Sequence, residues 1–192
     1  FISMIPLAFI NYGGIQAIKT LWAGPWMLNI SGYTPLQSAT GLFWINITML
    51  ISYFIWGYIL PKISDYGINS IKLIKLGLPI SYFSLFLIIY FGNNAGAFLF
   101  TIYIMTSIVI SLTQPAIALN FSKNLAGKSL TSFNVFLFSG TFFVQWGIGL
   151  IIDLCNNKGF DILSSYRISF SLFLILCVLS YTFFIYLNKN EN

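Results

Sequence analysis

The first long apolar run of the sequence contains a lysine, within the stretch GIQAIKTLW. Tyr12, Gln16 and Lys19 stand at positions i, i+4 and i+7, so a helix would place their side chains on one face. A phenol, an amide and an ammonium group offer hydrogen bonds to a polar solute, and the ammonium group also attracts an anion. The chemistry that this face suggests is recognition of a solute without covalent reaction.

Two interpretations of Lys19 are open. If the helix begins near residue 2, Lys19 lies about 26 Å along it, and its long stem could reach the membrane interface beside Trp22 and Trp26. Alternatively, Lys19 faces a cavity and attracts an anionic substrate. A cation in a medium of low dielectric constant needs a counter-charge, which a substrate carboxylate or an acid elsewhere in the protein would supply.

Three further apolar runs carry polar residues at helical spacing. These are Asn46, Tyr53 and Gly57 in the second run, Tyr103, Ser107, Ser111 and Gln114 in the fourth, and Asn134, Thr141 and Gln145 in the fifth. Each such residue could bond a neighbouring helix, at about 0.6 kcal/mol on average. Taken together, they favour an interior aqueous path. We predict a substrate cavity lined by Tyr12, Gln16, Lys19, Asn46, Tyr103, Gln114, Asn134 and Gln145, with Asn134 and Gln145 as the best candidates for substrate contact.

The composition is that of a membrane protein. Hydrophobic residues make up 58% of the 192 residues and charged residues 7%, whereas a soluble domain is about 45–50% apolar and about 25% charged. Six apolar runs can each cross about 30 Å of hydrocarbon as a helix, at residues 2–22, 40–60, 73–91, 97–119, 129–154 and 168–187. We predict an all-α polytopic membrane protein with six transmembrane helices in residues 1–187 and a polar tail at 188–192. AGPW and SGYTP would connect the first two helices.

The net charge of +5 is spread singly over the predicted loops, which indicates topology signals and not a nucleic-acid surface. Alternate loops share one side of a six-helix bundle, and this side would hold Lys62, Lys72, Lys75, Lys123, Lys128 and Lys189. On the opposite side, Lys158 and Arg167 are balanced by Asp153 and Asp161. Because cytoplasmic loops carry the excess of lysine and arginine, we expect both ends of the chain to be cytoplasmic.

Residues for covalent or metal chemistry are scarce. The sequence has no histidine and no Gly-x-Ser-x-Gly elbow, and its two cysteines, Cys155 and Cys177, lack a paired spacing. We therefore predict no enzyme activity, metal, disulfide or cofactor. No acid lies within a run except Asp153 at an outer end, so a proton-binding carboxylate would come from elsewhere in the protein.

Glycines recur on the first and fifth runs. Gly13, Gly14, Gly140, Gly147 and Gly149 could act as hinges or could let two helices pack closely. We favour close packing, because small residues are enriched where helices meet in membranes.

Three stretches of the sequence resemble the carboxy-terminal half of a bacterial major facilitator superfamily transporter: WAGPW, GYILPKISDYGI and AGKSLTSFNVFLFSGTFFVQWGIGLIID. The resemblance covers nearly the whole chain. It implies twelve helices in two six-helix halves, each a 3+3 repeat, in the bacterial inner membrane. The first, second, fourth and fifth helices of this half would line the central cavity, in agreement with the polar runs. The amino-terminal half would then be missing here, and the start at Phe1 suggests the same.

The loop after the second helix departs from the family pattern. Members often carry Gly-x-x-x-Asp-Arg-x-x-x-x-Gly there, and its acid helps to latch the cytoplasmic gate. The aligned residues are Gly57, Pro61, Lys62 and Gly67. Proline replaces the acid, so the resemblance does not extend to a carboxylate latch; Asp65 is nearby but out of register. We interpret Pro61 as a helix stop.

We predict that the protein is half of a secondary transporter, which binds a small solute near the membrane midplane and opens to each side in turn. Lys19 alone suggests an organic anion. Two alternatives are a transport-inactive scaffold or sensor with the same fold and a six-helix transporter that works as a homodimer. The expected partners are the lipid bilayer, the solute, and the other half or a second copy.

Overall fold

The structure is a computed structural model that describes residues 2–189, with the backbone alone at Lys123. All regular elements in this range are helices, as predicted. Five are long and apolar enough to cross a membrane: Pro35–Ser64, Ser70–Asn94, Ala97–Leu119, Asn124–Asn157 and Ile162–Leu187. They are compatible with an integral membrane protein, in keeping with the composition. Residues 190–192 of the predicted tail lie outside the described residues.

The first helical stretch is longer than predicted and changes its winding. It comprises α1 (Met4–Ala17), a π-helical turn η1 (Ile18–Trp22) and α2 (Ala23–Asn29). The prediction of a loop at AGPW was therefore wrong. Pro25, which lacks a backbone N–H, is the third residue of α2. The carbonyl group four residues earlier belongs to Leu21 in the wide π turn, where the regular ladder of hydrogen bonds is already interrupted. The proline is accommodated there, and the helix continues to Asn29.

Side-chain caps extend the next helices beyond the predicted apolar runs. α3 (Pro35–Ser64) begins after Thr34, whose hydroxyl accepts a hydrogen bond from the Gln37 amide in a capping box. α4 (Ser70–Phe91) begins after Asn69, whose side chain accepts a bond from the Lys72 amide. Such caps provide hydrogen-bond acceptors for backbone N–H groups of the first helical turn. The helices therefore begin in the polar turns, before the apolar runs.

The fourth stretch is also interrupted. It consists of α5 (Ala97–Ser107), a 3-10 turn η3 (Ile108–Leu112) and α6 (Thr113–Leu119). Two long helices, α7 (Lys123–Asn157) and α8 (Ile162–Leu187), complete the chain, and a short 3-10 turn η2 (Gly92–Asn94) follows α4.

Pro61 does not stop its helix, as we had predicted, because α3 continues to Ser64. A proline ring collides with the carbonyl group four residues earlier, and that residue is Gly57. Gly57 carries no side chain, and a Cβ placed there would meet no atom within 4 Å. The helix therefore has room to bend around the ring.

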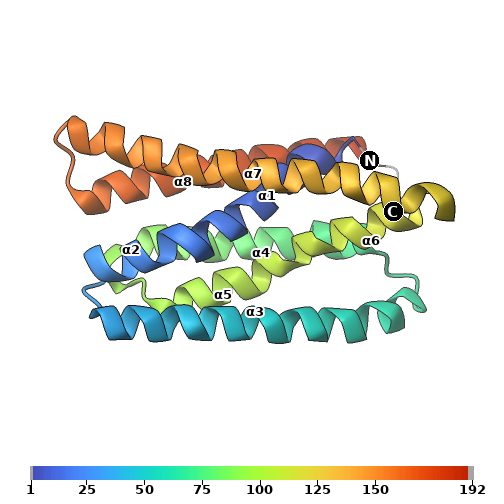
Figure 1. Cartoon of the computed structure of the whole chain (residues 1–192), viewed down its shortest axis with the longest axis horizontal. Helices are drawn as coiled ribbons and strands as arrows, with labels where there is room; N and C mark the ends of the chain where they lie inside the picture. Colours follow the sequence, from blue (N-terminus) through green and yellow to red (C-terminus); the bar gives the residue numbers. More distant parts are fainter. Residues whose placement is uncertain (1, 190–192) are drawn as a thin grey trace.

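The helices form two layers (Figure 1). The front layer of this view holds α3, α5 with α6, α1 with α2, and α7, while α4 and α8 lie behind. α1 packs against α7 and α8, α5 packs against α3 and α4, and α4 contacts α8. The third and sixth predicted helices, which correspond to α4 and α8, are thus the ones that form the back layer.

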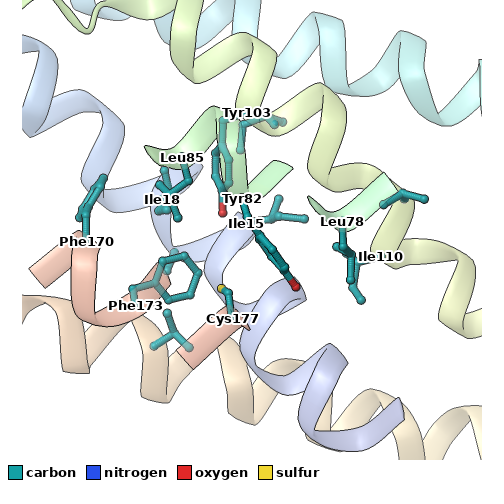
Figure 2. Packing of buried hydrophobic residues seen from close by; sticks show 14 of the residues in the cluster. Ile15, Ile18, Leu78, Tyr82, Leu85, Tyr103, Ile110, Phe170, Phe173 and Cys177 are labelled. Carbon is teal, nitrogen blue, oxygen red and sulfur yellow. The ribbon is translucent and has the colours of Figure 1, made fainter. Parts of the chain in front are cut away.

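The core between the layers is apolar with one polar network. Figure 2 shows Ile15 of α1, Leu78 and Leu85 of α4, and Phe173 of α8 among the buried side chains between these helices. Leu85 is fully buried, and Ile15, Leu78 and Phe173 are nearly so. These side chains join α1, α4 and α8 through the core.

Glycines let α1 and α7 cross with their backbones in contact. A Cβ added at Gly13 would stand 2.5 Å from the carbonyl carbon of Gly140, and one added at Gly140 would collide with the Phe9 carbonyl group. Gly14 faces the ring of Phe173. These three positions require glycine for packing, as we favoured, whereas a Cβ at Gly147 would meet nothing within 4 Å.

One end of the bundle collects the start of α1, the end of α8 and the α3–α4 and α6–α7 turns (Figure 1). Asn188, which we had placed in the tail, is buried and donates a hydrogen bond to the Ser3 hydroxyl, so the bundle continues past α8. Lys75 donates to the Asn188 carbonyl oxygen. At the other end, Arg167 donates to the carbonyl oxygens of Ile89 and Tyr90 at the end of α4, where a cation is favourable.

Candidate solute-binding face

Most of the predicted cavity residues belong to helices of the front layer. We call the side of the bundle that α1 with η1, α3, α6 and α7 form the polar face. The predicted residues on these helices are Tyr12, Gln16, Lys19, Asn46, Gln114, Asn134 and Gln145, of which Asn46 is exposed and the others are half-buried. These side chains belong to helices that make up the front layer in Figure 1.

The α1 stripe leans toward α3. The Gln16 amide donates to the Tyr12 hydroxyl at 3.0 Å, and the Lys19 ammonium group donates to the sulfur of Met49 at 3.4 Å. Tyr53 of α3 is an electrostatic neighbour of Tyr12. A thioether is only a weak acceptor. Lys19 forms no ion pair with a carboxylate of the described residues.

Lys19 lies within its helical stretch and not close to either end of it. The stretch of residues 4–29 continues for ten residues beyond it, so Lys19 lies about 22 Å from the start and about 15 Å from the end. Trp26, its expected companion at the membrane interface, is fully buried against Phe100 and Phe170. The ammonium group contacts Met49 of α3. Together with the buried Trp26, this contact favours the cavity interpretation over the interface.

The α6 and α7 side of the polar face is tied together by amides. The Gln114 side chain donates to Asn134 Oδ1 at 3.3 Å, so Asn134 acts in part as a bond between two helices. Gln145 accepts a hydrogen bond from the Trp22 indole through its backbone oxygen only. Its side-chain amide is available to a solute.

A pocket of about 330 Å³ opens beside Gln145, between η1 and α7. Its lining combines indole rings, one amide and one carboxylate and consists of Leu21, Trp22, Phe142, Gln145, Trp146, Gly149, Leu150 and Asp153. Gln145 is therefore the predicted contact residue that lines a hollow, whereas Asn46 is exposed and bonds back to the Leu42 carbonyl oxygen of its own helix.

Tyr103 does not share the polar face. It is 3% exposed and lies in the core near Tyr82 and Cys177, as Figure 2 shows. The reason is η3, which separates Tyr103 from Gln114. A 3-10 helix turns about 120° per residue against about 100° in an α-helix, so its five residues rotate the two ends of the stretch by about 100°.

A buried network was missed in the sequence. Asn11 donates to the Ser180 hydroxyl and to the Leu7 carbonyl oxygen, and it accepts from the Tyr82 hydroxyl at 2.9 Å. It thereby joins α1, α4 and α8. The available signal was an asparagine inside an apolar run, offset by one residue from the Tyr12 stripe and hence on a different face. All three polar groups are paired, so the network stabilises the bundle and offers nothing to a solute.

The gate-loop residues contact no described acid. The Lys62 ammonium group lies 3.8 Å from the ring centre of Tyr58 on the same helix, a cation–π contact. Gly67 has a φ of +76°, which suits the turn between α3 and α4, and the position of Gly57 is open. Within the described residues, no three His, Cys, Asp or Glu side chains gather as metal ligands would.

Comparison with known proteins brings no relative. No protein-family model, no curated protein and no solved structure matches this chain. A function for the chain therefore has to be argued from its motifs and from the geometry of the polar face.

Proposed function

We propose that this chain is the carboxy-terminal half of a secondary transporter of the major facilitator type, which moves a small organic anion by alternating access. The observation that carries the proposal is the position of Lys19. A half-buried cation within a long apolar helical stretch, on a face shared with other polar groups and without a described carboxylate partner, is suited to an anionic ligand. It also lies in a π turn, a distortion frequently found at functional sites.

The contacts between helices support a 3+3 repeat. If residues 4–29, α3 and α4 correspond to α5 with α6, α7 and α8, the pair α1–α7 corresponds to α5–α3, and α1–α8 corresponds to α5–α4. The contact of α2 with α3 likewise has its counterpart in α6 with α7. The first member of each repeat is interrupted, by η1 and by η3. Paired interruptions of this kind mark the binding site in transporters built from repeats.

The transport cycle needs binding and rocking only. The polar face would meet that of the other half, or of a second copy, and close around the solute near the membrane midplane. Lys19, on the α3 side of η1, would neutralise the solute's charge. Gln145 would offer its amide from the pocket between η1 and α7. Within the described residues the polar face has one carboxylate, the exposed Asp153 at the end of its pocket. A proton-coupling acid would therefore belong to the partner half.

The test is uptake by the complete protein in proteoliposomes, with benzoate, lactate and succinate as anionic probes. Glucose and tetraphenylphosphonium serve as neutral and cationic probes. We expect Lys19→Gln to weaken the apparent affinity for the transported anion at least about tenfold, or about 1.4 kcal/mol. Lys19→Arg, which keeps the charge, should retain most of the affinity. The control is Lys158→Gln, an exposed cation in the turn between α7 and α8 that is not among the predicted cavity residues.

Unchanged affinity in Lys19→Gln would remove Lys19 from the site. Competition by the neutral or cationic probe alone would overturn the anion. No uptake of any probe, together with solute-independent capture of a protein partner, would favour a scaffold or sensor. A crosslinked species near twice the 21.7 kDa of this chain, formed by two identical copies, would favour a homodimer.

A further inference from the structure

An apolar groove separates α3 from α4. It measures about 390 Å³ and is lined by Ser52, Ile55, Trp56, Leu73, Leu76, Gly77, Ile80, Met105, Thr106 and Val109, from α3, α4 and α5. The corresponding pair on the other side of the bundle, α7 and α8, packs in direct contact, whereas α3 and α4 make no comparable contact. The groove is thus the place where the two sides of the bundle differ most.

The residues that line the groove are suited to an apolar ligand. Their two hydroxyl groups are already bonded within their own helices, Ser52 to the Thr48 carbonyl oxygen and Thr106 to the Ile102 carbonyl oxygen, both at 2.8 Å. No charged side chain lines the groove. Leu76 is 71% exposed despite its position there. Filling the groove with hydrocarbon would bury this surface while both hydroxyl groups stay paired.

The helices that line the groove carry charged residues near one end only, and Arg167 of α8 binds carbonyl oxygens at the opposite end of α4. Lys62 follows Ile55 at i+7 on α3, and Lys72 precedes Leu76 by four residues on α4, so each lysine shares a helix face with a lining residue. Lys62 is exposed and Lys72 is half-buried, and Asp65 is the one acid in the turn between the two helices. In contrast, residues 20–61 and 76–122, which include the opposite ends of α3, α4 and α5, contain no charged residue.

We propose that this groove binds an acyl chain of an anionic phospholipid whose phosphate is held by Lys62 and Lys72. Lys72 lies about 12 Å along α4 from Ile80, and one leaflet contributes about 15 Å of hydrocarbon, so the chain fits the groove while its head group stays at the interface. Basic side chains at helix ends recognise anionic head groups in this way. The proposal does not depend on transport by the polar face.

The head-group test compares two lipids with identical acyl chains. The complete protein in detergent is titrated with phosphatidylglycerol or phosphatidylcholine, and bound lipid is counted by native mass spectrometry. We expect at least about tenfold tighter retention of phosphatidylglycerol, and the Lys62→Gln/Lys72→Gln variant should lose this preference. Lys158→Gln, at the opposite end, should keep it. Equal retention of both lipids by the unmodified protein, or a preference unchanged in the double variant, would overturn the proposal.

The groove test uses two exposed positions on α4. Ile80→Trp places an indole in the groove and should lower retention of both lipids at least about fivefold. Phe83→Trp is the matched control, because Phe83 is similarly exposed but does not line the groove. Undiminished lipid binding in Ile80→Trp would overturn the proposal. So would a native dimer that dissociates in this variant, since a second copy would then be the occupant.

Discussion

The two sides of the bundle hold their long front helices, α7 and α3, differently. On one side, α7 crosses α1 at Gly13 and Gly140, with backbone against backbone, and also rests on α8. On the other side, α3 approaches α5 near its beginning, where a Cβ at Gly41 would stand 2.8 Å from the Cβ of Ala97. Farther along, α3 leaves α4 uncovered and the apolar groove opens. The position of the glycine contact along each helix therefore accounts for the difference: α7 is held at its middle, whereas α3 is held near its beginning and leaves a groove beside α4.

The difference leaves α3 with most of its surface uncovered. Within its apolar window, 11% of the residues are buried, against 28% for α7. A helix that is held near one end by a small-residue contact loses fewer packing contacts when it tilts than a helix that is held at its middle. The comparison therefore assigns α3 as the more adjustable member of the front layer and α7 as the fixed one, a contrast that Gly140→Ala and Gly41→Ala test.

The largest effect is expected at the α1–α7 crossing. Gly140→Ala should lower the free energy of unfolding by about 1–3 kcal/mol, because the new Cβ meets the Phe9 carbonyl group, which cannot rotate away. The matched control is Gly147→Ala on the same helix, where nothing lies within 4 Å, with an expected change within about 0.5 kcal/mol. Unfolding of the complete protein in detergent measures both. Equal losses in the two variants would show that the crossing does not clamp α7.

A smaller effect is expected on the α3 side. Gly41→Ala meets Ala97 and the sulfur of Met27, and the flexible methionine can move aside, so we expect a loss of about 1 kcal/mol. Gly57→Ala, in open space on α3, is the control. The same unfolding measurement applies. A cost above that of Gly140→Ala would reverse the assignment of the fixed and the adjustable side.

The smallest effect on stability is expected at the N-terminal caps of α4 and α8, the two helices of the back layer. α4 begins at a neutral Asn69 and α8 at Asp161, where hydrogen bonds from the side chain and backbone of Ser164 hold the pKa of the Asp161 carboxyl below its ordinary value. Because the folded-state pKa is lowered, the contribution to stability is complete above the unfolded pKa of about 3.9 and is lost as the pH falls through the lower folded value.

We therefore expect the start of α8 to loosen slightly below about pH 4, while the start of α4 stays unchanged. Hydrogen exchange of the first turn of each helix, compared between pH 6 and pH 3 after correction for intrinsic rates, measures this. Asp161→Asn keeps an acceptor and should remove the pH dependence. Equal loosening of both helix ends in the unmodified protein would contradict the assignment to Asp161.

Local pattern was sufficient for much of the fold. Five of the six apolar runs located helices of membrane length, whereas the first run is not among them. Spacing along the first helical stretch predicted that Tyr12, Gln16 and Lys19 share a face, because helix periodicity follows directly from residue order. Helix ends were missed where caps such as Thr34 and a tolerated proline such as Pro25 extended the helix. The composition also determined that the chain's surface is apolar, whatever its tertiary arrangement.

Tertiary structure decided which polar residues meet and which stay apart. The 3-10 turn at η3 rotates Tyr103 into the core and leaves Gln114 on the polar face, although both belong to one predicted stripe. Asn11 accepts a hydrogen bond from Tyr82 because the tertiary structure brings this residue of α4 next to α1. The physical reason is that sequence spacing determines a face only while the helix keeps one pitch, and it contains no information about which neighbour covers that face.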